Sequence, residues 1–355
     1  MNTEAENSER ILEEKIRRLR KLTNLDRVIA GDKNSPRQIR TYFHLNRLAY
    51  RRFHSREGFM HFRISKDGEY HEEDVYYQPD VVESRIPRHG RVLELGFGQG
   101  ANLFYLAERR PDAFFCGVDI APTNPPRQME NLRLFQRNYA DLSNFPSSCF
   151  DVVYAIETIV YVSEKDPVFR EAFRVLKPGG TFIVYDYATA KPFEENDETI
   201  RTAVSLISKG GAGAVIESRP QWERHFQNAG FQNLQAADFA EEVLPDFLRL
   251  ERKAARFLDR PLLSKLLFRL APRPMTNNII LGYLAPDLCR TGAGAYMEWI
   301  EQKPRLSADG GSGKANQEDK NSEGGGDDKN SQDSERGGAD KENQDSERGE
   351  TKADQ

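Results

Sequence analysis

Residues 91–100 read RVLELGFGQG, in which an apolar segment runs directly into three closely spaced glycines. The apolar segment predicts a short buried strand. The glycines predict a turn whose bare backbone amides can face a nucleotide-like ligand at the start of the next helix, ANLFYLAERR. Gly96, Gly98 and Ala101 also fit the dinucleotide spacing G-x-G-x-x-G/A, whereas Glu94 favours a different ligand. The turn alone therefore predicts a nucleotide-like ligand without identifying it.

The segments that follow have the order that a doubly wound α/β domain requires. AFFCGVDI at 113–120 predicts a strand ending in Asp119, whose carboxylate can accept hydrogen bonds from the ribose hydroxyls of an adenosine ligand. A helix is predicted at about 126–136, and Asp141 follows in a loop where an acid can hold an adenine amino group. FDVVYAIETIVYV at 150–162 predicts the fourth strand and its loop, and PVFREAFRVL predicts a helix before the strand TFIVYDY.

The last part of the domain contains a helical insertion. SRPQWERHFQNAGF at 218–231 predicts a helix and turn before the sixth strand, QNLQAADFA. AYMEWIEQK at 295–303 predicts the last strand, with an alternation that suits a half-buried position. Between these strands, residues 241–290 predict helices that a minimal fold does not need, and 246–273 holds eight Arg or Lys against three Asp or Glu. A long insertion of this kind is usually functional.

Five motifs in order, ELGFGQG, VDI, YADL, FDVVYAIET and VLKPGGTFIVYDY, resemble those of the class I S-adenosylmethionine-dependent methyltransferases. The resemblance implies an α/β, doubly wound Rossmann-like sheet with helices on both faces, and S-adenosyl-L-methionine as cofactor. The alternative for the acids is that they are solvated strand ends. The cofactor contacts that the resemblance implies are Glu94, Gly96, Phe97, Gly98, Gly100, Asn102, Asp119, Ile120, Ala140, Asp141, Ala155, Ile156 and Glu157.

Three side chains are candidates for catalysis. The sulfonium methyl group is already activated, so a base is needed only if the acceptor must lose a proton. Glu157 lies just past the fourth strand and is either this base or a residue of the cofactor pocket. Tyr161 stands where many members of the family have histidine, which weakens a histidine-base mechanism at that position. His61, in an aromatic stretch ahead of the cofactor domain, is the third candidate.

Residues 37–90 are expected to form an N-terminal lid and substrate segment. From Tyr42 to Tyr77 the chain has nine Phe or Tyr residues in 36 positions, and four of its histidines fall in the same stretch. So many rings in little regular structure predict that they face a cavity, although any single ring can equally serve only to pack the segment onto the sheet. The insertion is expected to roof the same cavity. A peripheral membrane contact through 246–273 is the alternative for its basic helices.

The substrate class is narrowed by the loop after the fourth strand. Its sequence, AIETIVYV, lacks the Asn- or Asp-Pro-Pro-aromatic pattern that grips a flipped base, so no nucleic-acid substrate is expected. The motifs most resemble the sterol C-methyltransferase branch, which implies C-methylation of an apolar, sterol- or terpenoid-like small molecule. An O- or N-methyltransferase acting on a phosphobase, sugar or phenol remains an alternative, as does a non-catalytic cofactor-binding protein.

Composition predicts one large domain with polar extensions. Residues 1–36 predict a polar N-terminal helix or frayed extension, 91–304 the cofactor-binding domain, and 305–355 a disordered acidic tail of low complexity. Of the net charge of −5, the tail from 307 carries −7, since it has 14 acids and 7 bases, which leaves +2 for the rest. The three cysteines have no metal-binding or disulfide spacing, so no metal is expected. No apolar run is long enough to span a membrane. We therefore expect a cytoplasmic enzyme, with peripheral membrane contact through 246–273 as the alternative named above.

Overall fold

The computed structural model describes most of the first 305 residues of the 355-residue chain. The described residues are 2–30, 35, 37–43, 45, 55, 57–121 and 127–305. Residues Met1–Leu306 form one compact unit. Apart from its first residue, the predicted tail at 305–355 lies outside the described residues, and so does the middle of the aromatic segment.

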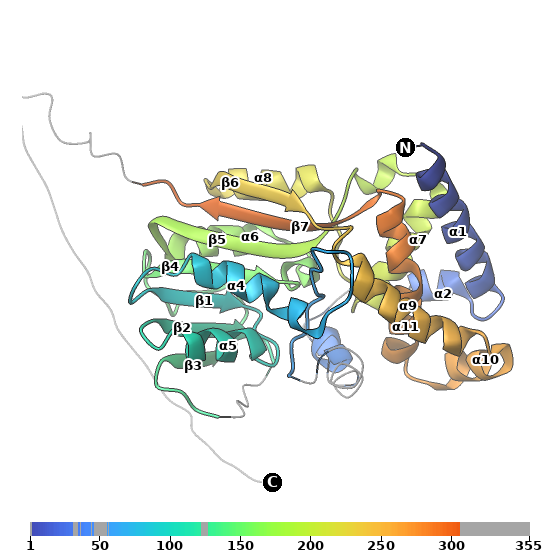
Figure 1. Ribbon diagram of the computed structural model, residues 1–355, viewed down its shortest axis with the longest axis horizontal. Coiled ribbons are helices and arrows are strands. Elements are labelled where there is room, and N and C mark those ends of the chain that lie inside the picture. The colour runs from blue at the N-terminus through green and yellow to red at the C-terminus, as the bar shows by residue number, and fades with distance from the viewer. Residues whose placement is uncertain are drawn as a thin grey trace, which may run out of the picture. The chain divides into compact units, whose positions relative to one another are not determined.

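In the described residues, seven strands form one sheet in the order β3-β2-β1-β4-β5-β7-β6 (Figure 1). Neighbours among β1 to β5 pair in parallel, whereas β7 is antiparallel to both β5 and β6. Helices cover both faces, so the predicted doubly wound α/β fold is confirmed. The strands are β1 (Arg91–Leu95), β2 (Phe114–Asp119), β3 (Leu132–Gln136), β4 (Phe150–Ile156), β5 (Leu176–Thr189), β6 (Gln232–Asp238) and β7 (Gly294–Gln302).

Each face of the sheet has its own apolar core. On one face, α6 (Asp166–Val175) and α8 (Arg219–Ala229) bury Phe169 and Trp222. On the other face lie α4 (Tyr77–Ser84) and α5 (Ala101–Arg109), which bury Val82 and Leu103 (Figure 1). The central strands are apolar on both sides because both sides are covered, as parallel strands require.

The predicted helix at about 126–136 is wrong. Residues 132–136, LRLFQ, form the edge strand β3, which pairs in parallel with β2 from Phe115↔Leu132 to Asp119↔Gln136. Only Leu132 is buried, so the strand lacks the alternation that identifies a half-buried strand. The backbone hydrogen bonds offered by β2 fix the conformation here, and the side-chain pattern does not reveal them.

The last strand is more buried than predicted. Every residue of β7 except Gln302 is buried, because β7 lies between β5 and β6 and not at the edge. Trp299 stacks on Trp222 at 4.8 Å on one face, while Tyr296 and Ile300 belong to the core of the other face. The alternation therefore sorts β7 side chains between two cores and not between core and solvent.

A group of helices, which we call the helical lobe, stands beside the end of the sheet where β7 begins (Figure 1). The predicted insertion is helical, as expected, and it packs with helices from two other parts of the chain. The lobe contains α1 (Asn2–Arg20), α2 (Leu25–Ile29), α7 (Glu198–Gly210), α9 (Leu244–Leu258), α10 (Pro261–Leu270) and α11 (Arg273–Arg290). The described residues also include the short 3₁₀ helices η1 (Glu72–Tyr76), η2 (Ile159–Tyr161) and η3 (Phe193–Glu195), and residues 37–43 are helical.

The N-terminal helix α1 docks against the lobe and is not a frayed extension. Leu12, Ile16 and Leu19 are buried on its inner side. Lys15 Nζ on the same side donates to Glu251 Oε1 at 2.5 Å and to the buried carboxylate of Asp287. A buried cation is tolerated only when it is paired in this way, so Lys15 fixes where α1 meets α9 and α11.

Candidate functional site

One large cavity lies at the carboxyl ends of the parallel strands and extends into the helical lobe. Its volume is about 1950 Å³, more than a small ligand fills. The glycine turn after β1 and the ends of β2, β4 and β5 form its sheet end, as the topology of open α/β sheets predicts for a ligand site. Residues from 39–45 and 57–62 form another wall.

The glycine turn has no room for side chains. Gly96, Gly98 and Gly100 all have positive φ, at 74°, 55° and 81°, in the left-handed region that favours glycine. A Cβ on Gly96 would overlap with the Thr158 hydroxyl, and one on Gly98 would lie 3.1 Å from Met60 Sδ. The aromatic segment therefore closes directly over the turn. The positive φ angles and this close packing both require glycine at these positions.

Asp119 shapes the turn from the end of β2. Its Oδ2 accepts a hydrogen bond from Gly98 N at 2.8 Å, and its Oδ1 accepts one from Ala121 N at 2.7 Å. Burial raises the pKa of this carboxyl, and the two backbone donors partly oppose the rise. Each carboxylate oxygen retains a lone pair beyond these bonds, so Asp119 can accept from a ligand hydroxyl as well.

A chain of buried polar groups runs beside the turn. Asn102 Nδ2 donates to Glu94 Oε1 at 3.1 Å, and His61 Nε2 lies 3.0 Å from Asn102 Oδ1. Because an amide oxygen only accepts, His61 donates from Nε2. Burial raises the pKa of Glu94 to about 8. Hydrogen bonds from Asn102 and Tyr154 partly oppose this rise. Glu94 lines the cavity, and a carboxylate has lone pairs for more than two donors, so it can also accept from a ligand's amino group.

Glu157 lies where the cavity turns from the sheet towards the lobe. Its φ of 50° is unusual for a residue other than glycine and swings the side chain away from the line of β4. Oε1 accepts from Phe62 N at 2.6 Å and from Tyr296 OH at 2.9 Å, and Oε2 accepts from Tyr187 OH. Burial raises the pKa of Glu157 to about 8, although all three donors favour the charged form.

Tyr161 lines the same part of the cavity from η2, and its ring meets that of Phe43 edge to face at 5.5 Å. The loop that carries it is held by Asp186, which is completely buried and accepts from Val160 N at 3.0 Å. Burial raises the pKa of Asp186 to about 7. Asp186 thus positions the loop without facing the cavity.

The structure brings most of the predicted site residues together. Those that line the cavity are His61, Glu94, Gly96, Phe97, Gly98, Asn102, Asp119, Ile120, Ile156, Glu157 and Tyr161. Gly100, Ala140, Asp141 and Ala155 do not line it. Asp141 is exposed, and its Oδ1 accepts from Ser143 N at 3.1 Å, an interaction that lowers its pKa. Its predicted contact with adenine stays a prediction.

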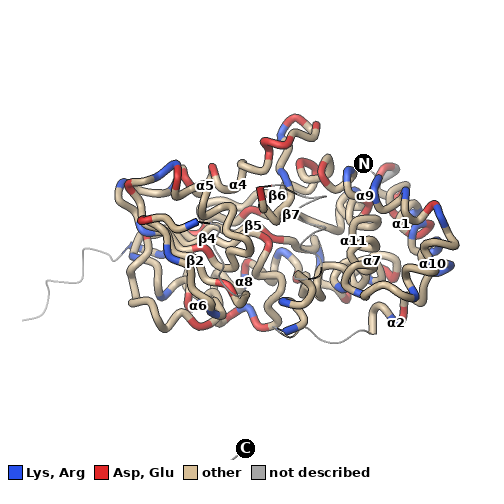
Figure 2. Tube along the Cα trace, turned by 90° about the horizontal axis from the view of Figure 1, so that it is seen from below, with Lys and Arg blue, Asp and Glu red and all other residues tan. Residues whose placement is uncertain are grey.

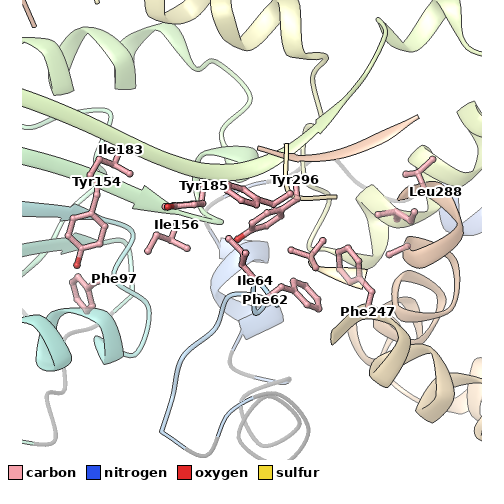
Figure 3. Close-up of a cluster of buried hydrophobic side chains, with 14 of the residues drawn as sticks. Phe62, Ile64, Phe97, Tyr154, Ile156, Ile183, Tyr185, Phe247, Leu288 and Tyr296 are labelled. Atoms are coloured by element: carbon pink, nitrogen blue, oxygen red, sulfur yellow. The ribbon is translucent and has the colours of Figure 1, made fainter. Parts of the chain in front are cut away.

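The cavity beyond Glu157 is apolar. Phe62 and Phe247 pack at 4.4 Å where the two parts join, close to Tyr296 (Figure 3). We call the part inside the lobe the apolar arm. Its lining residues include Ile207, Phe247, Leu250, Ala254, Phe257, Leu267, Met275, Ile279, Leu281 and Leu288. Lys253 also lines the cavity, and burial lowers its pKa.

Sequence reasoning missed several of these residues. Tyr187 and Tyr296 stand in strands that were predicted, but nothing in the sequence indicates that they meet at Glu157. The role of Asp186 in VYDY was also missed, although an acid inside an apolar strand indicates a specific hydrogen-bond partner. Among the described residues, no group of three His, Cys, Asp or Glu side chains could hold a metal ion.

Comparisons with known proteins show what this chain is similar to. Residues 93–184 match the family model described as "Methyltransferase domain". Phosphoethanolamine N-methyltransferase of Triticum aestivum is 29% identical over 162 residues, 43% of this chain and 30% of that protein. The sterol 24-C-methyltransferase of Aspergillus fumigatus is 35% identical over 97 residues, 27% of this chain and 26% of that protein. The chain thus spans less than a third of the length of these curated relatives.

Among solved structures, a mycolic acid cyclopropane synthase complexed with S-adenosylhomocysteine has a similar fold. The TM-score is 0.61 at 13% identity, and the match covers 77% of this chain and 99% of the other chain. The likeness covers more of the chain than the family model, which matches residues 93–184. At this identity it shows the fold alone.

Proposed function

We propose that this chain, which belongs to the class I S-adenosylmethionine-dependent methyltransferases, methylates a small apolar molecule, with C-methylation of a sterol- or terpenoid-like substrate as the reaction. One observation carries the proposal. A single cavity joins the glycine turn at Gly96 and Gly98 to the apolar arm, and Glu157 stands between them. A cofactor at the turn and an apolar molecule in the arm would thus share one enclosed space.

The residues at the sheet end fit the cofactor that defines the family. Gly96 and Gly98 line the cavity with bare backbone, Asp119 can accept from ribose hydroxyls, and Glu94 can accept from the amino group of the methionine part. Asn102 holds Glu94 in place through its other oxygen. The exposed Asp141 is the weakest of the expected contacts.

The apolar arm supports the choice of an apolar substrate. Its lining is aliphatic and aromatic over most of its length, and burying such a surface against a polar molecule would leave the molecule's polar groups unpaired. A bulky hydrocarbon gains about 25 cal/mol for each Å² that it buries there. Among the described residues, Lys253 is the cation that lines the arm, and it is placed to meet a polar end of an otherwise apolar substrate.

The chain's own residues can stabilise the positive charge and accept the proton in such a reaction. When bound, S-adenosylmethionine supplies a methyl group that bonds to one carbon of a double bond as the sulfur–methyl bond breaks, which leaves a positive charge on the substrate. The rings of Phe43 and Tyr161, which line the same cavity as Glu157, can offer a π face to a cation that forms there. Glu157 then accepts the proton that the substrate loses, and this loss restores a double bond.

A polar or aromatic acceptor methylated at oxygen or nitrogen is the second candidate. The observation that favours it is the relative named phosphoethanolamine N-methyltransferase, which is 29% identical over 43% of this chain. A protein that binds the cofactor without catalysis is the third candidate.

The test is incubation with methyl-labelled S-adenosylmethionine and, in parallel, a sterol- and terpenoid-containing lipid extract and a pool of polar metabolites. Label in the lipid fraction is the expected result, and it should fall in a Leu250→Ala/Leu267→Ala variant that widens the apolar arm. Label in the polar pool would replace the proposal with the second candidate. Cofactor binding without any labelled product would support the third.

A further inference from the structure

The helix α10 exposes a row of leucines that the proposed reaction does not explain. Leu262 is 84% exposed, Leu270 70%, Leu266 52% and Leu263 41%. Met275, at the start of α11, is 43% exposed. Outside this region, the large apolar side chains exposed among the described residues are scattered singly, as on an ordinary surface.

The exposed leucines share one side of the helix. At about 100° per residue, Leu262, Leu266, Leu270 and Leu263 fall within an arc of about 100°. The buried Ser264 lies opposite, and its hydroxyl donates to Phe257 O at 2.9 Å, which ties α10 to the end of α9. This contact with α9 fixes the orientation of α10, and the side that carries the leucines therefore faces solvent.

Basic residues flank the leucines. From Arg260 to Arg273 the chain has four Arg or Lys and no Asp or Glu. All four, Arg260, Lys265, Arg269 and Arg273, are exposed. Figure 2 shows this cationic end of the helical lobe at α10. Apolar side chains beside a cluster of cations are the pattern of a helix that lies in the surface of an anionic membrane.

The same helix also borders the cavity. Leu267, on the side of α10 away from Leu262, lines the apolar arm, as do Ala271 and Met275 just after the helix. Met275 is both exposed and cavity-lining. The exposed apolar surface is thus continuous with the interior where an apolar substrate would lie.

We propose that α10 is a docking surface for anionic lipid bilayers, with Leu262, Leu266 and Leu270 entering the acyl boundary and Lys265 and Arg269 meeting the headgroups. Charge complementarity selects this occupant, because a second copy of the same cationic face would be repelled. The proposal does not depend on methyl transfer. If both proposals hold, an apolar substrate can pass from the bilayer past Met275 into the apolar arm without crossing water.

The test is co-sedimentation of the full chain with vesicles of equal parts phosphatidylcholine and phosphatidylglycerol, and with vesicles of phosphatidylcholine alone. Binding to the anionic vesicles is expected, and Leu262→Ser/Leu266→Ser/Leu270→Ser should weaken it by about tenfold or more. The matched control is Leu234→Ser, which removes an exposed leucine from β6 and should leave binding unchanged.

A second set of variants tests the role of the positive charges. It compares Lys265→Gln/Arg269→Gln on α10 with the control Arg170→Gln/Arg224→Gln on α6 and α8. Only the first pair should weaken binding and abolish the preference for phosphatidylglycerol. Vesicle binding that survives the leucine change, or that weakens equally in both charge pairs, would overturn the proposal. A dimer that the leucine change converts to monomer, with no vesicle binding by the original chain, would assign α10 to self-association instead. Cofactor affinity, measured in parallel, verifies that each variant is folded.

Discussion

Replacing Glu157 by glutamine tests whether this carboxylate is the base. The carboxylate accepts three hydrogen bonds, from Phe62 N, Tyr296 OH and Tyr187 OH. A glutamine oxygen can keep the first two, and its amide can donate to the Tyr187 oxygen if that hydroxyl turns. The substitution therefore preserves the shape of the site while removing the group that can accept a proton.

The expected loss in kcat is about 10²- to 10⁴-fold, the usual contribution of a positioned general base. Cofactor affinity should change little, because the glycine turn and Asp119 are untouched. The original enzyme should also show kcat rising with pH through an apparent pKa of about 8, since a base works only when deprotonated. In Glu157→Gln the remaining activity should lack this rise. Methyl transfer from labelled cofactor, followed from pH 6 to pH 9 or so, measures both.

Stability gives an independent readout of the same group. The pKa of Glu157 is raised from the ordinary 4.5 to about 8, so the folded protein keeps a proton that the unfolded chain releases between these values. This group therefore makes the free energy of unfolding fall as pH rises through that window, by about 5 kcal/mol at most. Denaturant unfolding of Glu157→Gln should lack this part of the fall. Near-normal kcat together with an unchanged pH profile in the variant would refute the role of Glu157 as base.

Three further outcomes are expected. Asp119→Ala should weaken S-adenosylmethionine binding by about 1–3 kcal/mol in calorimetry, and NADH should not bind; tight NADH binding would contradict the family assignment. Lys15→Ala should lower the unfolding free energy by up to about 3–5 kcal/mol, because the buried Asp287 loses its Lys15 partner and keeps Arg290 at 3.4 Å, while Arg10→Ala on the exposed side of α1 should cost little. Leu267→Ala should raise the substrate KM while cofactor affinity stays unchanged. An unaltered KM would contradict a contact between Leu267 and the substrate.

The cofactor half of the site was predictable because its signals are local. A strand, a glycine turn and a helix follow one another within 91–109, and the acid at Asp119 ends the next strand. Parallel topology then brings these ends together without further information from side chains. The error at β3 has the opposite origin. Its conformation depends on hydrogen bonds to β2, which the sequence of 132–136 does not reveal.

The surroundings of Glu157 depend on register, which explains why they could not be read from the sequence. Tyr187 and Tyr296 are directly opposite each other in the antiparallel pair of β5 and β7, more than a hundred residues apart in the chain. A shift of one residue in either strand would turn its tyrosine to the other face and leave Glu157 with a donor missing. The buried carboxylate thus requires one register of β7, and the same register places Trp299 against Trp222 on the opposite face. The fold of the last strand and the chemistry at the centre of the cavity are therefore fixed by one and the same pairing.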